Sequence, residues 1–586
     1  MPDITRETLI DALEQIATLL ELKGENPFKI RAYRSGAEVV RTFPGDLLLL
    51  ARNQQLDGIK GLGEALRDKL HTLAATGSLP FLEELKAEFP SSLFDLFDIA
   101  GLGPKKVAAL YRELGVASIP DLQRACDDGS LAQLPGFGPK SAANLHEAIQ
   151  ARAAFADTFR LDQVAPAARE ILDYLRQHPD TSRAEVAGSF RRGKETVHDL
   201  DFLVTTPHPQ AITEAFIAPP WVQSVIASGP TKTSVRLHSG VQCDLRTVSN
   251  AEFPFALAYF TGSKEHNIQL RARALKLGWT LNEYRFSPTS PTSPPPPQDL
   301  FEEAEIHRAL GLDFIEPALR EGSGEIEAAE AHTLPRLVEL DNLRGTFHNH
   351  TTASDGHASL REMAEAAQEL GLQYLGIADH SHSSFQANGL DETRLRHQIA
   401  EIRALNAEFA PHFQLLAGSE VDILKDGSLD FPDDLLAELD YVVASVHSSF
   451  SLPEAEMTAR ILRAVQNPYV TILGHLTGRL LLKRPSYPLD IPTILDACAA
   501  NGTIIELNAN PHRLDLDWRW WRLAKEKGVR CAINPDAHTV HGLQDLWYGM
   551  QIARKGWLTR SDVVNCLPLS KIAAALAHKR APSAHP

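Results

Sequence analysis

Nine side chains of types that bind metal ions lie between residues 348 and 538, and most of them stand where an apolar run ends. They are His348, His350, Asp355, His380, Glu420, His447, His475, Asp536 and His538. A tetrahedral zinc site needs only four ligands, so nine predict a cluster of ions. Two or three ions held a few ångströms apart are the usual apparatus for breaking phosphate esters. We therefore expect phosphoesterase chemistry in this part of the chain.

The placement of these residues, more than any single one, carries the prediction, because a lone histidine is more often a surface or core residue. Seven short apolar segments occur here, several of them separated by amphipathic stretches such as LREMAEAAQELG. Strands that alternate with helices predict a parallel sheet, here a closed or distorted barrel. Reactive residues gather at the carboxyl ends of barrel strands, which is where His380, His447 and His475 stand.

A second group of carboxylates lies in the middle of the chain. Asp199 and Asp201 follow the sequence GSFRRG and are two residues apart, so both project from one face of a predicted strand. Asp244 lies on another predicted strand, VQCDLRTV. Three carboxylates on adjacent strands can hold two magnesium ions, which prefer oxygen ligands and substrate phosphates. One ion would activate a 3′-hydroxyl and the other would steady a triphosphate leaving group.

Three Gly-x-Gly turns, each followed by a predicted helix, occur in the first 150 residues. Their glycines are Gly61 and Gly63, Gly101 and Gly103, and Gly136 and Gly138. Glycines let backbone amides approach a phosphate, and the following helix contributes its positive end. Lys105, Lys106 and Lys140 add charge to the second and third copies. One such turn commonly just caps a helix. Three copies resemble helix-hairpin-helix motifs, which grip a DNA backbone without reading its sequence.

Global properties narrow the classes of protein. The 586 residues suffice for about four domains. No apolar run approaches the ~20 residues of a membrane span. Five scattered cysteines without a CxxC pair predict a reducing cytoplasm, with neither disulfides nor a thiolate zinc site. The net charge of −17 argues against a general polyanion binder but allows local basic surfaces. The proline- and serine-rich residues 286–300 predict an extended spacer or an exposed loop.

The segments HNHTTASDG, ADHS, GSEVDI, VHSS, GHLTGR and PDAH resemble the motifs of the PHP (polymerase and histidinol phosphatase) domain across residues 340–575. The resemblance implies a distorted seven-stranded β/α barrel that holds up to three metal ions, with the nine residues above as ligands. Manganese or zinc suits so many histidines better than magnesium does. Asp379 and Glu506 are further carboxylates nearby. Asp379 either orients His380 or serves an ordinary hydrogen-bonding role.

Residues 1 to about 330 resemble the family X DNA polymerases, the group of DNA polymerase beta. The resemblance implies that Asp199, Asp201 and Asp244 are catalytic and bind Mg²⁺ or Mn²⁺. It assigns triphosphate contacts to Gly188, Ser189 and Arg192, a sugar-sensing turn to Tyr259, Phe260 and Gly262, a base-edge contact to Asn267 and a template-side contact to Arg271. Val197, His198 and Lys264 depart from the pattern of the beta enzyme, which leaves triphosphate affinity and sugar discrimination open.

The N-terminal helices resemble the small lyase domain of the same family. By that resemblance Lys69 is the Schiff-base lysine that cleaves a deoxyribose phosphate, and Lys29 and Tyr33 belong to the 5′-phosphate pocket. Such a lysine needs a lowered pKa or a nearby positive group to act as a nucleophile. Ala65 stands where the beta enzyme has a lysine. A solvated helical lysine is the alternative interpretation.

Together these patterns predict a multidomain protein of α+β and α/β class. The predicted ranges are 1–80 for a lyase-like helical domain with a helix-hairpin-helix motif, 81–153 for fingers with two more, 154–249 for a nucleotidyltransferase palm, 250–330 for a thumb, 331–340 for a linker, 341–575 for the PHP barrel and 576–586 for a tail.

The predicted activity is DNA repair synthesis, in which short gaps are filled from dNTPs. The barrel would add a 3′→5′ exonuclease or an endonuclease that acts at abasic sites. The predicted partners are gapped or nicked DNA and dNTPs, without a membrane, and the protein is expected to be a cytoplasmic monomer. Two alternatives are a small-molecule phosphatase of the PHP type and a DNA-end-binding scaffold with a silent palm.

Overall fold

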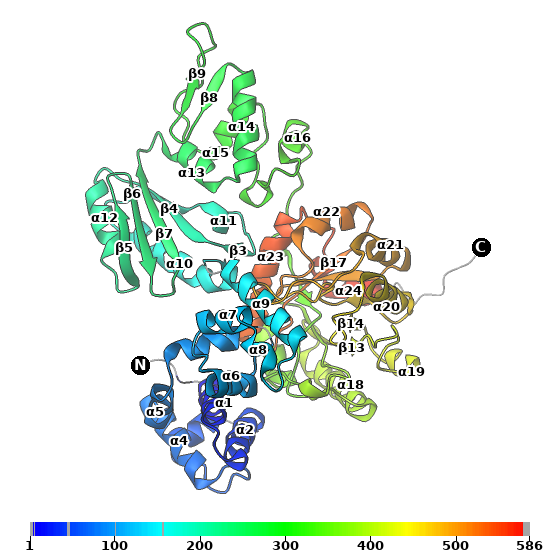
Figure 1. Ribbon diagram of the computed structural model, residues 1–586. Coiled ribbons are helices and arrows are strands. Elements are labelled where there is room, and N and C mark those ends of the chain that lie inside the picture. Colours follow the sequence, from blue (N-terminus) through cyan, green and yellow to red (C-terminus); the bar gives the residue numbers. More distant parts are fainter. Residues whose placement is uncertain (1–3, 5, 44–46, 100, 155–156, 578–586) are drawn as a thin grey trace, which may run out of the picture. The chain divides into compact units, whose positions relative to one another are not determined.

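The computed structural model describes residues 4, 6–43, 47–99, 101–154 and 157–577 (Figure 1). The chain separates into two compact units, Met1–Ala156 with Leu482–Arg484, and Asp157–Leu481 with Pro485–Pro586. None of the helices in these described ranges has both the length and the apolar character needed to cross a membrane.

The first unit consists of helices. They are α1 (Arg6–Lys23), α2 (Pro27–Thr42), α3 (Leu47–Arg52), α4 (Glu64–Thr76), α5 (Pro80–Ala87), η1 (Ser91–Asp98), α6 (Pro104–Leu114), α7 (Ile119–Asp127), α8 (Ser130–Gln133) and α9 (Pro139–Ala154). Apolar residues spaced three or four apart give α1 one hydrophobic face, and Leu9, Leu13, Ile16 and Leu20 on it are at most 1% exposed. Each predicted Gly-x-Gly turn directly precedes a helix, namely α4, α6 or α9.

The second unit begins with a five-stranded sheet in the order β2-β4-β7-β6-β5. The strands are β2 (Arg183–Val186), β4 (Asp199–Thr205), β5 (Val222–Ser228), β6 (Lys232–Leu237) and β7 (Gln242–Val248). β4 and β7 run parallel and the other pairs antiparallel. Apolar residues of α10 (Leu161–Gln177) and α12 (Pro209–Ile217) pack with those of the strands in one core. The GSFRRG segment begins just after β2 and forms one helical turn, α11 (Gly188–Arg191).

A smaller α+β region follows the sheet. It contains α13 (Phe253–Thr261), α14 (Lys264–Lys276), the hairpin β8 (Trp279–Leu281) and β9 (Phe286–Pro288), α15 (Glu303–Ala309) and α16 (Glu325–Glu330). The proline-rich residues 286–300 fold back on this hairpin: the Trp279 indole donates a hydrogen bond to the Pro294 carbonyl at 2.8 Å. The exposed-loop interpretation of this segment is therefore correct, and it is not a spacer between domains.

The rest of the unit is a ring of parallel strands (green to red in Figure 1). The strands are β10 (Gly345–Thr346), β11 (Tyr374–Ile377), β12 (Gln414–Ala417), β13 (Glu420–Asp422), β14 (Val443–Ser445), β15 (Ile472–Leu473), β16 (Ile504–Asn508) and β17 (Cys531–Asn534). β12 and β13 belong to one chain segment interrupted at Gly418 and Ser419, so the seven predicted segments are all present. Parallel bridges from His380 to Glu420 and from Asn349 to Ala537 join the three-stranded and five-stranded sheets.

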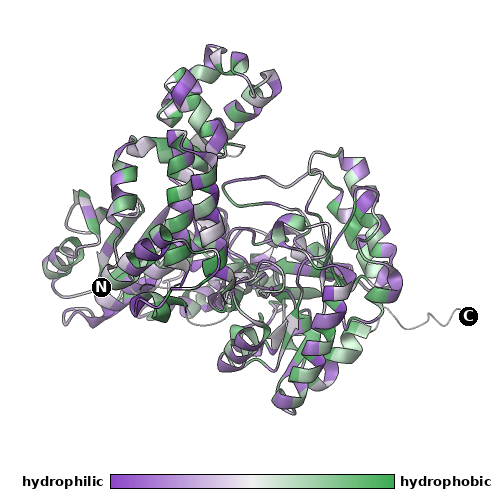
Figure 2. Cartoon of the chain, turned by 90° about the horizontal axis from the view of Figure 1, so that it is seen from below, coloured by the Kyte–Doolittle hydropathy of each residue, from purple (hydrophilic) through white to green (hydrophobic). Residues whose placement is uncertain are grey.

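Helices lie outside this ring. They are α17 (Leu360–Glu369), α18 (Glu392–Phe409), α19 (Asp433–Leu436), α20 (Glu454–Gln466), α21 (Ile491–Asn501), α22 (Trp518–Glu526), α23 (Leu546–Lys555) and α24 (Leu569–Ala577). Figure 2 shows hydrophobic and hydrophilic residues interspersed along the helices of the chain, as expected of helices that cover a core on one face.

The segments before and after the barrel differ in how much of them is described. Residues 331–340, expected to be a linker, are partly built into the fold, because Val338 is fully buried and its amide donates to the Leu558 carbonyl at 2.9 Å. Of the predicted tail 576–586, residues 578–586 lie outside the described ranges.

Candidate functional site

The barrel gathers the nine predicted ligands at the carboxyl ends of its strands. His348 and His350 follow β10, His380 follows β11, and Glu420 opens β13. Asp355 lies in the loop between β10 and α17. The other ligands follow later strands: His447 after β14, His475 after β15, and Asp536 and His538 after β17. A side chain just past a strand has left the sheet's hydrogen bonding but is still held by it, which fixes the position of each ligand.

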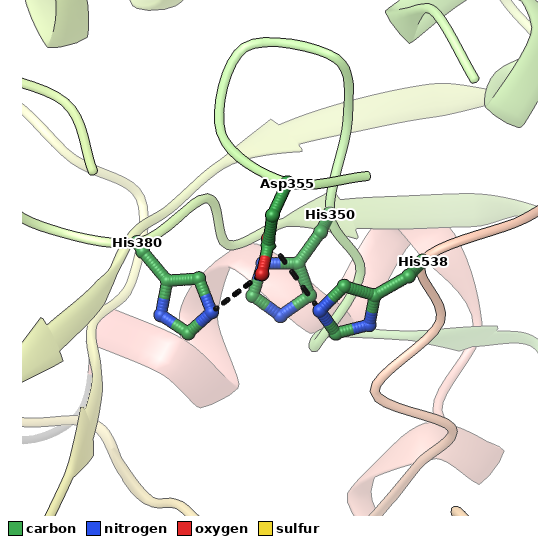
Figure 3. A group of neighbouring side chains, drawn as sticks. All are labelled: His350, Asp355, His380 and His538. Carbon is green, nitrogen blue, oxygen red and sulfur yellow. Dashed lines mark ion pairs between the residues drawn. The ribbon is translucent and has the colours of Figure 1, made fainter. Parts of the chain in front are cut away.

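Three groups of these side chains each bring one ligand atom per residue within 4.8 Å of the others. The groups are His350, Asp355, His380 and His538 (Figure 3); His348, His350 and Asp536; and His380, Glu420 and His447. His350 and His380 each belong to two groups, so the three positions adjoin. His475 joins them through its Nε2 atom, 2.9 Å from Oε1 of Glu420.

Glu420 is the electrostatic centre of the cluster. It is 1% exposed, and its carboxylate lies 2.9 Å from Nδ1 of His380 and 3.2 Å from Nε2 of His447. Burial alone would raise the pKa of Glu420, but the charges of His447, His348 and His380 hold it well below its usual value. Within the described part of the chain, four buried ring nitrogens of these ligands have no hydrogen-bond partner, namely Nε2 of His348 and Nδ1 of His350, His380 and His475.

Among them, Nε2 of His348 lies 3.3 Å from Glu420 and Nδ1 of His350 lies 3.8 Å from Asp355. Unpartnered buried nitrogens beside carboxylates fit a site for divalent cations, because an orphaned buried polar atom is otherwise costly. Nitrogen and oxygen donors in this proportion fit manganese or zinc.

Carboxylates behind the ligands fix their orientation. Glu506 accepts hydrogen bonds from Nδ1 of His348 at 2.7 Å and from the backbone amide of His475 at 2.8 Å. Asp422 pairs with Nδ1 of His447 at 2.9 Å. Such outer carboxylates select the tautomer that leaves the other ring nitrogen free for a metal. Sequence reasoning noted Glu506 without a role and missed Asp422, although Asp422 lies two residues from Glu420 on the same strand and hence on the same face.

Asp379 does not orient His380. Its carboxylate accepts hydrogen bonds from the Thr351 amide at 2.8 Å, the Thr351 hydroxyl at 2.6 Å and the Ser354 hydroxyl at 2.5 Å. Asp379 and His380 both lie in the described part of the chain, and no hydrogen bond joins them. The ordinary hydrogen-bonding role is therefore the correct one of the two alternatives, and Asp379 secures the loop that carries Asp355.

A cavity of about 410 Å³ opens over the cluster and is lined by Glu420 and six more of the nine ligands, together with residues outside the set. Arg513 is the one lysine or arginine among its lining residues. Its Nε atom lies 3.5 Å from Oδ2 of Asp536. Sequence reasoning did not identify Arg513, because it lies in a loop that only the fold brings to the site.

The second group of carboxylates lies on the five-stranded sheet. Asp201 on β4 is the direct register partner of Asp244 on β7, and Asp199 precedes Asp201 on the same face. Burial and then the charges of Asp199 and Asp244 raise the pKa of Asp201 to about 7. Burial also acts on Asp244, but hydrogen bonds, above all that of Lys232 at 2.6 Å, lower its pKa. Converging carboxylates that repel one another are an arrangement that a bound cation would stabilise.

The three carboxylates differ from the barrel cluster in one respect. Among the described residues, their carboxylate oxygens do not all come within 4.8 Å of one another, as the ligand atoms of each barrel group do. Oxygen donors that leave coordination positions open suit magnesium, which keeps waters or substrate phosphates as ligands.

Gly188, one of the residues predicted to hold a nucleotide, lies next to these carboxylates. Gly188 has a left-handed φ of +66°, and a Cβ there would stand 2.5 Å from Oδ2 of Asp201, so only glycine fits. Ser189 is the next residue of α11. Arg192 donates to the carbonyl of Thr261, directly before Gly262 at the end of α13.

Tyr259 and Phe260 lie at the end of α13, and the other two residues predicted near the nucleotide, Asn267 and Arg271, both contact Tyr259. The rings of Tyr259 and Phe260 meet edge to face with centroids 5.0 Å apart. Asn267 donates to the Tyr259 carbonyl at 2.8 Å, and the Arg271 guanidinium lies 5.0 Å from the Tyr259 ring centroid. The structure thus brings this subset together within one region.

The three glycine turns of the helical unit share one backbone conformation. Gly61, Gly101 and Gly136 have left-handed φ values of +95°, +89° and +90°. At the second glycine of each turn (Gly63, Gly103, Gly138), an added Cβ would meet nothing within 4 Å. The surface in front of each following helix is therefore open to a phosphate. Among the lysines, Lys106 donates to the Gly101 carbonyl at 2.9 Å, and Lys105 and Lys140 lie in the first turns of α6 and α9.

Lys69 on α4 lies with its ammonium group 4.5 Å from the centroid of the Phe81 ring, and that ring stacks on Tyr33. Burial is the main cause of a lowered pKa of Lys69, and the charge of Lys29 lowers it further. Lys29 itself lies 3.6 Å from Glu25. The structure therefore brings the three predicted lyase residues into one region.

Comparisons with known proteins bear on the whole chain. A DNA polymerase/3′-5′ exonuclease PolX of Bacillus subtilis (strain 168) is 40% identical over 577 residues, which are 97% of this chain and 99% of that protein. The chain belongs to the family X DNA polymerases. Within this family X chain, a helix-hairpin-helix domain matches residues 5–79, a SAM-like helix-hairpin-helix tandem 93–151, the DNA polymerase beta thumb 256–321 and the PHP domain 346–510.

Probable phosphatases share a smaller part of this family X protein. One from Thermoanaerobacter sp. (strain X514) is 30% identical over 230 residues, 37% of this chain and 88% of its own. Another from Acetivibrio thermocellus is 31% identical over 201 residues, 33% of this chain and 78% of its own. The predicted family and fold class are confirmed, and the phosphatase alternative explains about a third of the chain.

Proposed function

We propose that this family X polymerase fills short gaps in DNA by template-directed addition of dNTPs and removes nucleotides in the 3′→5′ direction with its barrel. The observation that carries the proposal is that two separate groups of potential metal ligands lie in a chain that matches a polymerase/exonuclease along nearly its whole length. The helix-hairpin-helix regions support DNA as the substrate.

The synthetic site consists of Asp199, Asp201 and Asp244. Mg²⁺ or Mn²⁺ held there would supply positive charge to the reacting phosphate and to the attacking 3′-hydroxyl. In this proposal Gly188, Ser189 and Arg192 bind the triphosphate, which is supported by the close approach of the Gly188 backbone to Asp201. Tyr259, Phe260 and Gly262 line the sugar, while Asn267 and Arg271 lie towards the base and the template.

The degrading site consists of the nine ligands of the barrel. Up to three Mn²⁺ or Zn²⁺ ions held there would supply Lewis acidity toward a phosphodiester. Arg513, the permanent cation of the cavity, is placed to donate hydrogen bonds to a non-bridging phosphate oxygen. Glu506 and Asp422 keep His348 and His447 in the ligand orientation.

A second proposal concerns Lys69 as a Schiff-base nucleophile for 5′-deoxyribose phosphate, with Lys29 and Tyr33 at the phosphate. The lowered pKa of Lys69 supports it, since a neutral amine is the reactive form. Borohydride should then trap a covalent adduct with incised abasic DNA, and Lys69→Ala should abolish it. An undiminished adduct in Lys69→Ala would rule the role out.

The test of the main proposal uses a gapped duplex labelled at the primer 5′ end. We expect extension by dNTPs with Mg²⁺ or Mn²⁺, and stepwise shortening when dNTPs are omitted and Mn²⁺ is present. Hydrolysis of histidinol phosphate without DNA degradation would establish the phosphatase alternative. Tight binding of gapped DNA without nucleotide addition would establish the scaffold. We further infer a monomer in the cytoplasm, in line with a DNA substrate.

A further inference from the structure

Phe385 stands at the cavity over the barrel cluster with its ring almost entirely in water. Its side chain is 78% exposed, yet it lines the same cavity as His380, His447 and Arg513. Single exposed apolar residues are common on protein surfaces, so exposure alone indicates nothing. An aromatic ring at the rim of a phosphoesterase cavity is a different matter, because its π-face is presented beside the reacting centre.

The loop that carries Phe385 is held firmly. The Ser383 amide donates to Asp430 at 2.6 Å, and the Ser384 hydroxyl donates to Oδ2 of Asp422 at 2.6 Å. The other oxygen of Asp422 pairs with Nδ1 of the ligand His447 at 2.9 Å. One carboxylate therefore fixes both a predicted metal ligand and the loop next to Phe385, which sets the ring at a defined place relative to the cluster.

The other residues that line the cavity suit the phosphate of a nucleotide. The cavity floor carries histidines and carboxylates, and Arg513 adds one cation, which suits a phosphodiester. A volume of about 410 Å³ lies in the range of sites for small ligands. Apart from histidines, Phe385 is the aromatic residue of the lining. Bases of single-stranded nucleic acid bind proteins by stacking on aromatic rings, largely without regard to sequence.

We propose that Phe385 stacks on the base of the 3′-terminal nucleotide while its phosphodiester occupies the metal-binding cluster. The inference rests on the proposed exonuclease function and deepens it by identifying a nucleobase contact. Stacking requires no hydrogen-bond pattern, so the enzyme removes all four nucleotides, purines more tightly bound than pyrimidines. It also disfavours double-stranded ends, whose terminal base is already paired and stacked.

The experiment compares two single-stranded oligonucleotides, one with an ordinary 3′-terminal nucleotide and one whose terminal residue is a tetrahydrofuran analogue without a base. The variants are Phe385→Ala and Phe385→Trp, used in the full-length protein loaded with Mn²⁺. Because the ring is exposed, neither change disturbs the core, and metal content and primer extension serve as controls. Phe385→Ala should raise KM for the ordinary end by about 5- to 150-fold, the range that stacking of one base provides.

The baseless end provides the decisive comparison. Wild-type enzyme should already bind it weakly, and Phe385→Ala should change its KM by less than about twofold, while Phe385→Trp should retain wild-type behaviour on both ends. An equal loss on both oligonucleotides, or no loss on either, would overturn the stacking contact. If the wild-type protein degrades neither oligonucleotide, the exonuclease function itself fails and this inference falls with it.

Discussion

Nδ1 of His348 lies 2.7 Å from Oε1 of Glu506, and both side chains are 0% exposed. The carboxylate holds the ring so that the opposite nitrogen, Nε2, faces Glu420 at 3.3 Å. A buried carboxylate behind a histidine raises the basicity of that ligand and fixes its tautomer. The barrel centre is therefore built in two layers, ligands in front and carboxylates behind.

Glu506→Gln should weaken metal binding by the barrel roughly 10- to 100-fold, because the amide cannot hold His348 in the same charge state. The measurement is the Mn²⁺ concentration that gives half-maximal exonuclease activity. Glu526→Gln on α22 is the control, since that carboxylate is 64% exposed and remote from the ligands. Equal Mn²⁺ requirements for both variants would contradict the orienting role.

Much of this centre could be predicted from the sequence, for a local reason. The ligands follow short apolar runs, and parallel strands bring their ends to one edge of a barrel, so the spacing of His380, His447 and His475 was informative. Asp422, Arg513 and Phe385 could not be assigned in this way. Each depends on a tertiary contact: Asp422 meets a histidine from the next strand, and the loops of the other two reach the cavity only after folding.

Acid should destabilise the region of α13 to α16 through His307, which is fully buried. Burial first, and then the charge of Arg320, lower the pKa of His307 to about 3. The unfolded chain binds its proton near pH 6.5, so this contribution to stability is complete above that pH and is lost as the pH falls toward 3. Between pH 7.5 and pH 4.5, the unfolding free energy of His307→Gln should fall by about 2 kcal/mol less than that of the wild type. Parallel losses would show that His307 does not titrate this way.

Lys555 of α23 should stabilise the contact between the barrel and the polymerase region. Its ammonium group is buried, 2.5 Å from Glu321, and donates to the Arg192 carbonyl at 3.1 Å. Removing one partner of a buried ion pair costs roughly 3–5 kcal/mol, and the retained Arg192–Glu321 pair at 2.9 Å places Lys555→Met at the lower end. Chemical denaturation should show that the variant with both Lys555→Met and Glu321→Gln loses less stability than the sum of the losses in the two single variants. A loss in the double variant equal to that sum would argue against a direct pair.

The glycine turns should contribute a salt-dependent grip on DNA. Substituting Lys105, Lys106 and Lys140 together by alanine should weaken binding of gapped DNA and reduce the slope of log K against log salt by up to about 0.9 per lost phosphate contact. Lys86→Ala is the control, because that lysine pairs with Glu83 on α5. Fluorescence anisotropy across a salt series gives both slopes. A triple variant with an unchanged slope would mean that these lysines do not touch phosphates.

The central claim is that one chain holds two independent phosphate-transfer sites. Asp199→Ala with Asp201→Ala, and separately His348→Ala with His350→Ala, can be assayed on one gapped duplex for both primer extension and 3′ degradation. We predict that the first pair abolishes extension and leaves degradation within about twofold of wild type, and that the second pair does the reverse. If either pair removes both activities while the protein stays folded, the two sites are not independent and the account is wrong.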